Sequence, residues 1–346
     1  MIISLIRSNL RKFKPYTSAR SLYQKGIFFD ANENPFGSVV ETPMASELNR
    51  YPDPSSLDLR KAIGTFLGLS AENILVGNGS NEAIDLLIRL FVEPDEEILT
   101  IEPTYGMYAV IAELANVRIH RFSLRDDFTL DMPALLKSIT PKTKIIFCCS
   151  PNSPTGTLID PKDVKGLCLS FKGIVVVDEA YVEFSSRPSS AQKVFELQNL
   201  VVLRTFSKAW GLAGIRVGYA VAQKETINYL NSIKLPYNLN RLSSELALQA
   251  LKRYSQMEEW KRLLVAERKT LAKALKELGL TVFPSEANFL LVRFPNASTV
   301  AQKLATDYGL IVRDFGTKPL LTDCIRISVG TPEQNELLVR TLTKLL

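Results

Sequence analysis

The sequence predicts an α/β protein with a mostly parallel central sheet flanked by helices and a smaller α/β domain at its carboxyl end. Three observations lead to this prediction. Short apolar runs recur between residues 74 and 203, amphipathic segments separate these runs, and helical sequence dominates over 223–278. Strands that are apolar along their whole length are typical of a parallel sheet covered on both faces, and the intervening helices supply the crossovers that parallel strands need.

The elements of the large domain follow in chain order. A helix is expected over 57–67, and strands are expected at 74–76, 97–101, 144–149, 173–177 and 200–203. The glycine-containing turn at 77–82 joins the first strand to a helix over 83–91, so the free N–H groups of that helix would face an anion site. Ser80 in this turn fits an N-cap as well as an anion ligand, and the two roles are compatible.

The last third of the chain has a different pattern. It predicts, in order, helical sequence over 223–278 with a break near 236–238, a strand at 288–294, a helix over 298–308, a strand at 324–329 and a final helix. Thr331 would cap that final helix, and Pro332 suits its first turn. We therefore expect an amino-terminal arm over 1–40, a large domain over 41–235, and bridging helices with a small domain over 236–346.

Composition limits the possible partners. The chain has 346 residues, of which 46% are hydrophobic and 23% charged, and no apolar run approaches the roughly 20 residues that span a membrane. A cytoplasmic location is the default expectation. The net charge of +6 is spread along the chain without a basic run, which suits anionic small molecules better than nucleic acid.

Cysteine and histidine usage restricts the chemistry further. The four cysteines show no C-x-x-C spacing, so we expect reduced core residues. The single histidine, His120, lies in an alternating run and is most simply a surface residue of an edge strand. A histidine metal centre is therefore excluded and a Ser-His-Asp site is disfavoured. The chemistry has to come from lysine, carboxylates, tyrosines or a cofactor.

Lys208 has an unusual setting for a lysine. It follows the apolar run 200–203, so it leaves the end of a buried strand. An apolar or cation-rich setting lowers the pKa of a lysine amine and makes it nucleophilic, and Arg216 is a nearby cation. Ser207 and Arg216 also offer a hydroxyl and a forked cation to a phosphate. Most lysines are solvated charges, so Lys208 alone would not indicate a site. Together with Ser207 and Arg216, it predicts a Schiff-base site for pyridoxal phosphate (PLP).

Other polar side chains follow the ends of the predicted strands, where ligands collect in parallel sheets. Asn152 and Tyr181 are placed to bind the phenolic oxygen of PLP, and Tyr105 fits either ring stacking or ordinary packing. Asp178 follows four apolar residues and would pair with the pyridine nitrogen, although an Asp-Glu pair there also fits helix capping or a metal carboxylate. Arg326, in an alternating run, suits a clamp on a carboxylate or phosphate.

Several motifs together resemble those of a known family. The match to fold-type I PLP-dependent aminotransferases rests on Ser-Pro-Asn-Ser-Pro-Thr-Gly at 150–156, Asp-Glu-Ala-Tyr at 178–181 and Ser-Lys-Ala-Trp-Gly-Leu-Ala-Gly-Ile-Arg at 207–216. The resemblance narrows to the histidinol-phosphate aminotransferases through Asn-Glu-Asn-Pro at 32–35, Arg-Tyr-Pro-Asp at 50–53 and Arg-Ile-Ser-Val-Gly at 326–330. Each motif alone is unspecific, but their joint occurrence along nearly the whole chain is specific.

The resemblance implies a role for each matching position. Lys208, Asp178 and Tyr181 would be catalytic. The cofactor ligands that it implies are Ser80, Asn81, Tyr105, Asn152, Asp178, Tyr181, Ser207, Lys208 and Arg216, with Tyr51 reaching the phosphate held by the neighbouring subunit of a homodimer. The substrate ligands that it implies are Tyr16, Asn32, Asn152, Arg313 and Arg326.

The implied activity is ping-pong transamination between a small-molecule amino donor and a keto acceptor. Histidinol phosphate and 2-oxoglutarate would be interconverted with imidazole acetol phosphate and L-glutamate, in histidine biosynthesis, with Lys208 as general base and acid. Three alternatives stay open. An aromatic amino acid aminotransferase shares the cofactor residues, a threonine-phosphate decarboxylase would release CO₂, and a PLP-binding regulatory domain would transfer no amino group.

Overall fold

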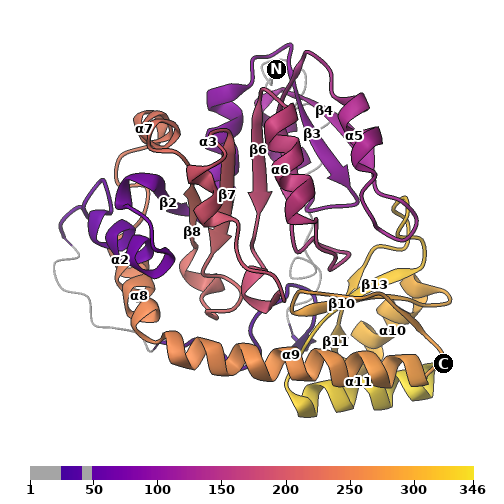
Figure 1. Ribbon diagram of the computed structural model, residues 1–346. Helices are drawn as coiled ribbons and strands as arrows, with labels where there is room; N and C mark the ends of the chain where they lie inside the picture. Colours follow the sequence, from indigo (N-terminus) through magenta and orange to yellow (C-terminus); the bar gives the residue numbers. More distant parts are fainter. Residues whose placement is uncertain (1–24, 41–48) are drawn as a thin grey trace, which may run out of the picture.

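The computed structural model describes residues 25–40 and 49–346, and a seven-stranded sheet lies at its centre (Figure 1). The strand order is β2-β8-β7-β6-β5-β3-β4, and β8 alone runs against the direction of the other six. The strands are β2 (Ile74–Asn78), β3 (Glu97–Glu102), β4 (Arg118–Ser123), β5 (Thr143–Cys149), β6 (Ile174–Asp178), β7 (Leu200–Thr205) and β8 (Val217–Val221).

Both faces of this sheet are covered. In β7, Leu200 and Val202 pack into one apolar core, while Val201 and Leu203 pack into another on the opposite face. One core is completed by α3 (Ser80–Phe91), α4 (Met107–Ala115) and α7 (Lys224–Ile233). The other is completed by α2 (Leu57–Leu67), α5 (Met132–Ser138), α6 (Pro161–Ser170) and α8 (Arg241–Lys252). Because successive strand side chains point to opposite faces, burial on both faces requires the continuous apolar runs seen in the sequence.

A second sheet forms the small domain. It has four antiparallel strands in the order β12-β13-β10-β9, namely β9 (Thr281–Val282), β10 (Phe289–Arg293), β12 (Arg313–Asp314) and β13 (Cys324–Ser328). Its helices are α10 (Ala297–Tyr308) and α11 (Pro332–Leu345). The long helix α9 (Tyr254–Glu277) runs from the end of α8 to this domain along the lower edge of Figure 1.

The amino-terminal segment belongs with the small domain in space. Its strand β1 (Ile27–Phe28) pairs in parallel with β11 (Leu310–Ile311), and Phe29 lies in the core of the small domain. The residues that follow, 30–34, therefore pass between the two sheets. This path brings the Asn-Glu-Asn-Pro motif to the carboxyl edge of the large sheet.

The structure confirms the predicted fold class and corrects two details. The final helix starts with a capping box at Thr331, as expected. Helix α3, however, begins at Ser80 with Gly79 in the N-cap position, so the interpretation of Ser80 as an N-cap is wrong. The sequence did not predict β8, because Gly218 and Tyr219 interrupt its apolar pattern. None of the helices in the described ranges has the length and apolarity to span a membrane.

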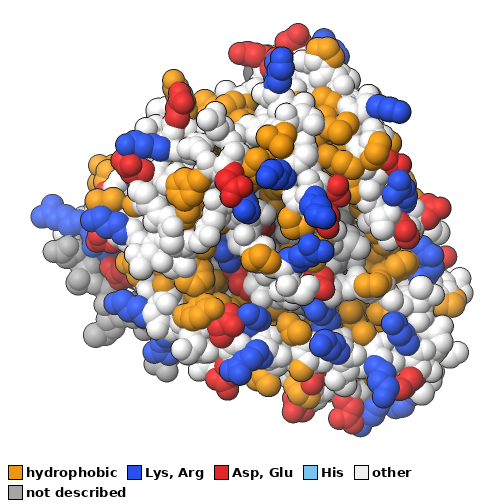
Figure 2. Space-filling view, in the orientation of Figure 1, with side chains coloured by type: hydrophobic (Ala, Val, Ile, Leu, Met, Phe, Trp, Pro, Cys, Tyr) orange, Lys and Arg blue, Asp and Glu red, His pale blue; other side chains and the backbone are white. Residues whose placement is uncertain are grey.

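The surface has a mixed charge distribution on the face drawn in Figure 2. Lysine and arginine side chains alternate with aspartate and glutamate there, and no continuous basic stripe runs across the described residues on that face. His120 lies on the edge strand β4, partly exposed, with its Nδ1 3.6 Å from Glu97 Oε1.

Candidate active site

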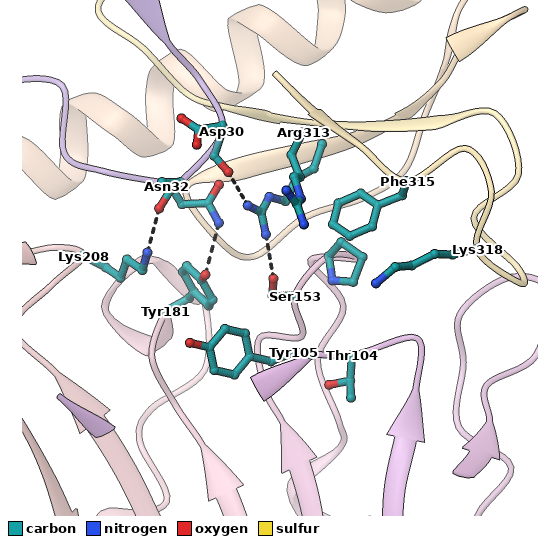
Figure 3. Close-up of a pocket in the computed structure, with 14 residues that line it drawn as sticks. Asp30, Asn32, Thr104, Tyr105, Ser153, Tyr181, Lys208, Arg313, Phe315 and Lys318 are labelled. Atoms are coloured by element: carbon teal, nitrogen blue, oxygen red, sulfur yellow. Dashed lines mark hydrogen bonds between the residues drawn. The ribbon is translucent and has the colours of Figure 1, made fainter. Parts of the chain in front are cut away.

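Two cavities of about 240 Å³ each meet at the carboxyl ends of β5, β6 and β7. Both are lined by Ala31, Tyr105, Ser153, Tyr181 and Lys208. The first, here called the α3 cavity, is also lined by Glu33, Ser80, Asn81, Cys149, Asp178, Ala180, Thr205, Ser207, Ala213 and Arg216. The second, the arginine cavity, is also lined by Asp30, Asn32, Thr104, Gly106, Pro154, Arg313, Phe315, Lys318 and Arg326 (Figure 3).

Lys208 lies in the wall between the two cavities. Its Nζ donates a hydrogen bond of 2.7 Å to the carbonyl oxygen of Ala31 and lies 5.6 Å from the ring centre of Tyr181. Burial, and secondarily the charge of Arg326, lowers the pKa of this amine to about 8. An amine with such a pKa is partly neutral near pH 7 and is therefore available as a nucleophile or a base.

Asp178 ends β6 and is 2% exposed. Its Oδ2 accepts a hydrogen bond of 2.7 Å from Tyr108 Oη, and its Oδ1 accepts one of 3.2 Å from the N–H of Ala180. Burial raises the pKa of the Asp178 carboxyl group, and the Tyr108 bond opposes that rise. A cationic group in the α3 cavity would also oppose it, because an opposite charge favours the carboxylate.

Tyr108 is a residue that the sequence did not reveal as part of the site. It lies on α4, is fully buried and stacks on Phe147 with ring centres 4.6 Å apart. The only available signal was its place three residues after Tyr105, a candidate ring-stacking residue on the loop before α4. The contact with Asp178 depends on how α4 packs on the sheet, which no local pattern specifies.

The start of α3 forms a cradle for an anion. Ser80 and Asn81 open this helix, and the Ser207 Oγ and Arg216 Nη1 atoms lie 3.5 Å apart on the opposite loop. The carbonyl oxygen of Arg216 accepts a hydrogen bond of 2.8 Å from the N–H of Gly79. A Cβ atom at Gly218 would lie only 2.2 Å from the nitrogen of Ser80, so glycine is needed there for β8 to approach the helix start.

Asn32 links the two domains at the site. Its Nδ2 donates to Tyr181 Oη at 3.1 Å, and its Oδ1 accepts from the hydroxyl of Ser328 on β13 at 2.8 Å. Tyr181 is buried, and burial raises the pKa of its hydroxyl. Asn152, by contrast, is 5% exposed and gives both amide hydrogens to protein acceptors, the carbonyl oxygen of Pro103 and the hydroxyl of Thr155. Its predicted bond to the cofactor would require one of these bonds to break.

Two arginines face the arginine cavity from neighbouring strands. Arg313 on β12 and Arg326 on β13 are directly opposite each other in the ladder. Arg326 donates to Ser153 Oγ at 2.9 Å and to the carbonyl oxygen of Asp30. Like charges directly opposite each other destabilise a strand pair, so this arrangement indicates an anionic ligand.

Three of the expected residues are not placed in either cavity. Asn152 borders a separate pocket with Ile101 and Thr157. Tyr16 falls outside the described residues. Tyr51 is 79% exposed, stacks on Tyr237 at 4.6 Å between ring centres, and lines neither cavity. The site residues that the sequence did not reveal are Asp30, Thr104, Tyr108, Ser153, Phe315 and Lys318.

A reactive lysine and a buried aspartate, at neighbouring strand ends of a mostly parallel sheet, define the class of fold-type I PLP enzymes. Residues 24–342 match the family model described as aminotransferase class I and II, and the chain belongs to this family. The predicted resemblance is thus confirmed.

Known proteins resemble the chain over nearly its whole length. It is 44% identical to the histidinol-phosphate aminotransferase of Cytophaga hutchinsonii and 41% identical to that of Parabacteroides distasonis, covering 98% of this chain and 97% of the relative in each case. Among solved structures, the histidinol-phosphate aminotransferase of Sinorhizobium meliloti in complex with pyridoxal 5′-phosphate matches with a TM-score of 0.90 and 25% identity, covering 99% of this chain and 97% of that one.

The residues around the α3 cavity fit PLP, the cofactor of this family. A phosphate dianion would meet hydroxyl, amide and guanidinium donors at the start of α3, where glycines leave room for the backbone to approach. Asp178 and Lys208 line the same cavity, where the buried carboxylate would face the ring nitrogen and the amine would face the aldehyde. The donor set therefore matches the charged groups of PLP.

Proposed function

We propose that the protein is a PLP-dependent transaminase that interconverts histidinol phosphate and 2-oxoglutarate with imidazole acetol phosphate and L-glutamate. The names of relatives about 40% identical to the chain support this substrate pair. The observation that carries the proposal is the opposed pair Arg313 and Arg326, in the same cavity as Lys208. This pair suits the anionic end that histidinol phosphate and glutamate have in common.

Each side chain has a distinct part in the proposed reaction. PLP, when bound, supplies an electron sink for the substrate Cα carbanion. Asp178 would hold a proton on the ring nitrogen, and Tyr181 would donate to the phenolic oxygen. Lys208, with its low pKa, would take the proton from the substrate Cα and deliver it later in the same half-reaction. Arg326 and Arg313 would orient the substrate by its anionic end.

The test is a comparison of amino donors with the PLP-loaded protein. We expect kcat/KM for histidinol phosphate to exceed that for phenylalanine by at least about tenfold, because the phosphate is a dianion and the carboxylate of phenylalanine is a monoanion, which satisfies the cations of the cavity less fully. The keto product is measured in the presence of 2-oxoglutarate. A preference for phenylalanine would indicate an aromatic amino acid aminotransferase. Release of CO₂ from threonine phosphate would indicate a decarboxylase. If no donor transfers its amino group, the protein would be a PLP-binding domain.

A homodimer with shared active sites completes the proposal. Exposed apolar side chains share one surface pocket with Tyr51, namely Tyr237 at 42% and Leu242 at 38% exposure. Tyr51 would reach the phosphate held by the partner subunit. Mixing Lys208→Ala protein with Tyr51→Ala protein, each nearly inactive, would then restore turnover, because a mixed dimer contains one intact site. Absence of recovery, with dimers observed by ultracentrifugation, would contradict shared sites.

The location and the domain division are proposed on separate grounds. All four cysteines are buried free thiols, which suits a reducing compartment such as the cytoplasm. The pairing of β1 with β11 supports grouping residues 25–40 of the proposed arm (1–40) with the small domain over 236–346, and the proposed large domain covers 41–235.

A further inference from the structure

We propose that Lys318 is a specificity-determining residue, whose ammonium group makes the arginine cavity select a phosphate dianion over a carboxylate. This inference rests on the proposed function and deepens it, because it assigns the phosphate of the substrate to a third cation beside Arg313 and Arg326. Lysine suits this part as a compact point charge, while the arginines supply forked hydrogen bonds.

The loop that carries Lys318 is held in place by its backbone. The N–H of Phe315 donates to the carbonyl oxygen of Cys324, and the N–H of Lys318 donates to that of Phe315, at 3.0 and 2.8 Å. Leu321, whose N–H donates to the carbonyl oxygen of Lys318 at 3.0 Å, is fully buried and anchors the far end. The side chain of Lys318 therefore starts from a fixed turn and extends into the cavity (Figure 3).

The aromatic ring of Phe315 lies close to three cationic side chains. The charged ends of Lys318, Arg313 and Arg326 lie 5.5, 5.8 and 5.8 Å from its ring centre. Cation–π contacts attract positive groups without neutralising them. The ring thus gathers three positive charges at one wall of the cavity while leaving their charge available to a ligand.

The arginine cavity has more positive charge than one carboxylate would neutralise. Its described lining holds four cationic side chains and one carboxylate, Asp30, whereas the α3 cavity holds two of each sign. Burial lowers the pKa of Lys318, and Arg313 lowers it further, while Glu102 opposes both. A dianion beside Lys318 would offset that repulsion about twice as well as a monoanion at the same distance.

A plain structural interpretation is that Lys318 is a surface lysine, since the residue is exposed. Exposed charges contribute little to binding, because water and salt screen them. The two interpretations differ in one measurable respect. A solvated lysine affects all anions weakly and alike, whereas a phosphate ligand affects phosphate and carboxylate differently.

The experiment compares Lys318→Gln, Lys318→Arg and the wild type, all loaded with PLP. Two readouts use the half-reaction of glutamate alone, in which the amino group passes to PLP and each site releases one 2-oxoglutarate. They are the apparent dissociation constant of glutamate, from the dependence of the single-turnover rate on its concentration, and the inhibition of that rate by inorganic phosphate. The third is the KM for histidinol phosphate. Lys172→Gln is the matched control, because it makes the same change in charge at an exposed site just before β6, at the opposite end of the strands.

We expect Lys318→Gln to raise the KM for histidinol phosphate and the inhibition constant of phosphate by about tenfold, the loss of one charged hydrogen bond. The apparent dissociation constant of glutamate should rise only about twofold, as expected when one of several cations near a monoanion is lost. The kcat should change little, because Lys318 touches no reacting atom. Lys318→Arg should keep phosphate affinity within about threefold, since it retains the charge.

Three results would overturn the inference: unchanged phosphate inhibition in Lys318→Gln, equal weakening of glutamate and phosphate, or a loss in Lys318→Arg as large as in Lys318→Gln. Thermal unfolding of each variant shows whether the fold is retained. If the wild type does not convert histidinol phosphate, the proposed function fails, while phosphate inhibition of glutamate conversion still decides the role of Lys318.

Discussion

The α3 cavity and the arginine cavity have equal volumes and share Lys208, but they differ in charge and in origin. The lining of the α3 cavity balances two cationic side chains with two carboxylates, and most of it comes from the large domain. The arginine cavity has an excess of cations, supplied mostly by the β12–β13 region of the small domain. A lining with equal numbers of positive and negative side chains suits a cofactor that stays bound. A lining with an excess of positive side chains suits an anionic substrate that enters and leaves.

The largest effect is expected where the cavities meet. Lys208→Ala removes the only lysine in the described lining of the α3 cavity, and therefore both the amine for the PLP aldehyde and the proposed base. We expect turnover to fall by at least about 10⁴-fold, since general base catalysis alone contributes 10²–10⁴, together with loss of the visible absorbance of lysine-bound cofactor. Lys172→Ala is the matched control. Substantial turnover by Lys208→Ala would contradict the proposed roles of both cavities in transamination.

The second prediction separates the cavities by their arginines. Arg326→Gln should lower kcat/KM for histidinol phosphate by roughly a hundredfold or more, because truncating one partner of a buried charge contact costs about 2–5 kcal/mol. Its affinity for PLP should stay near that of the wild type. Arg216→Gln should have the opposite profile, with a larger effect on PLP affinity than on kcat/KM for histidinol phosphate. Equilibrium titration with PLP and steady-state kinetics measure the two effects, and identical profiles would refute the division of roles.

The sequence predicts the α3 cavity better than the arginine cavity, for a physical reason. Continuous apolar strands lead directly to Asp178 and Lys208, and parallel topology brings their ends together, so local patterns suffice. The arginine cavity depends on the small domain docking against the loop at 30–34. Arg326 was detectable because a charge interrupts an alternating run, whereas Lys318 lies in an irregular loop without any pattern.

Side-chain partners were the least predictable part of the site. Asn152 was correctly expected near the strand ends, yet its amide hydrogens are engaged by Pro103 and Thr155 within its own neighbourhood. Tyr108 looks like a core residue of an apolar helix, and its bond to Asp178 arises only from the packing of α4. Such contacts depend on tertiary geometry, and sequence spacing alone does not specify them.

A smaller effect, restricted to the α3 cavity, is expected for Tyr108→Phe. This change removes the hydroxyl that donates to Asp178, so the pKa of Asp178 should rise and less of it should be ionised. We expect kcat to fall by roughly tenfold, the equivalent of one charged hydrogen bond, with the acidic limb of the pH profile moved to higher pH. The KM for glutamate should change little. Tyr219→Phe, which removes another buried hydroxyl from the sheet, is the control. A rise in KM with an unmoved pH profile would contradict this role.

The smallest expected effect concerns electrostatic coupling between the two cavities, through the pKa of Lys208. Because the pKa of Lys208 is about 8 rather than the 10.5 of a free lysine, PLP capture by the cofactor-free protein should speed up with a midpoint near pH 8 and level off above it. The charge of Arg326 helps to lower this pKa, so Arg326→Gln should move the midpoint to higher pH. Stopped-flow absorbance at several pH values measures it. A midpoint that stays fixed in Arg326→Gln would mean that burial alone sets the Lys208 pKa, and that the substrate arginine does not act across the shared wall.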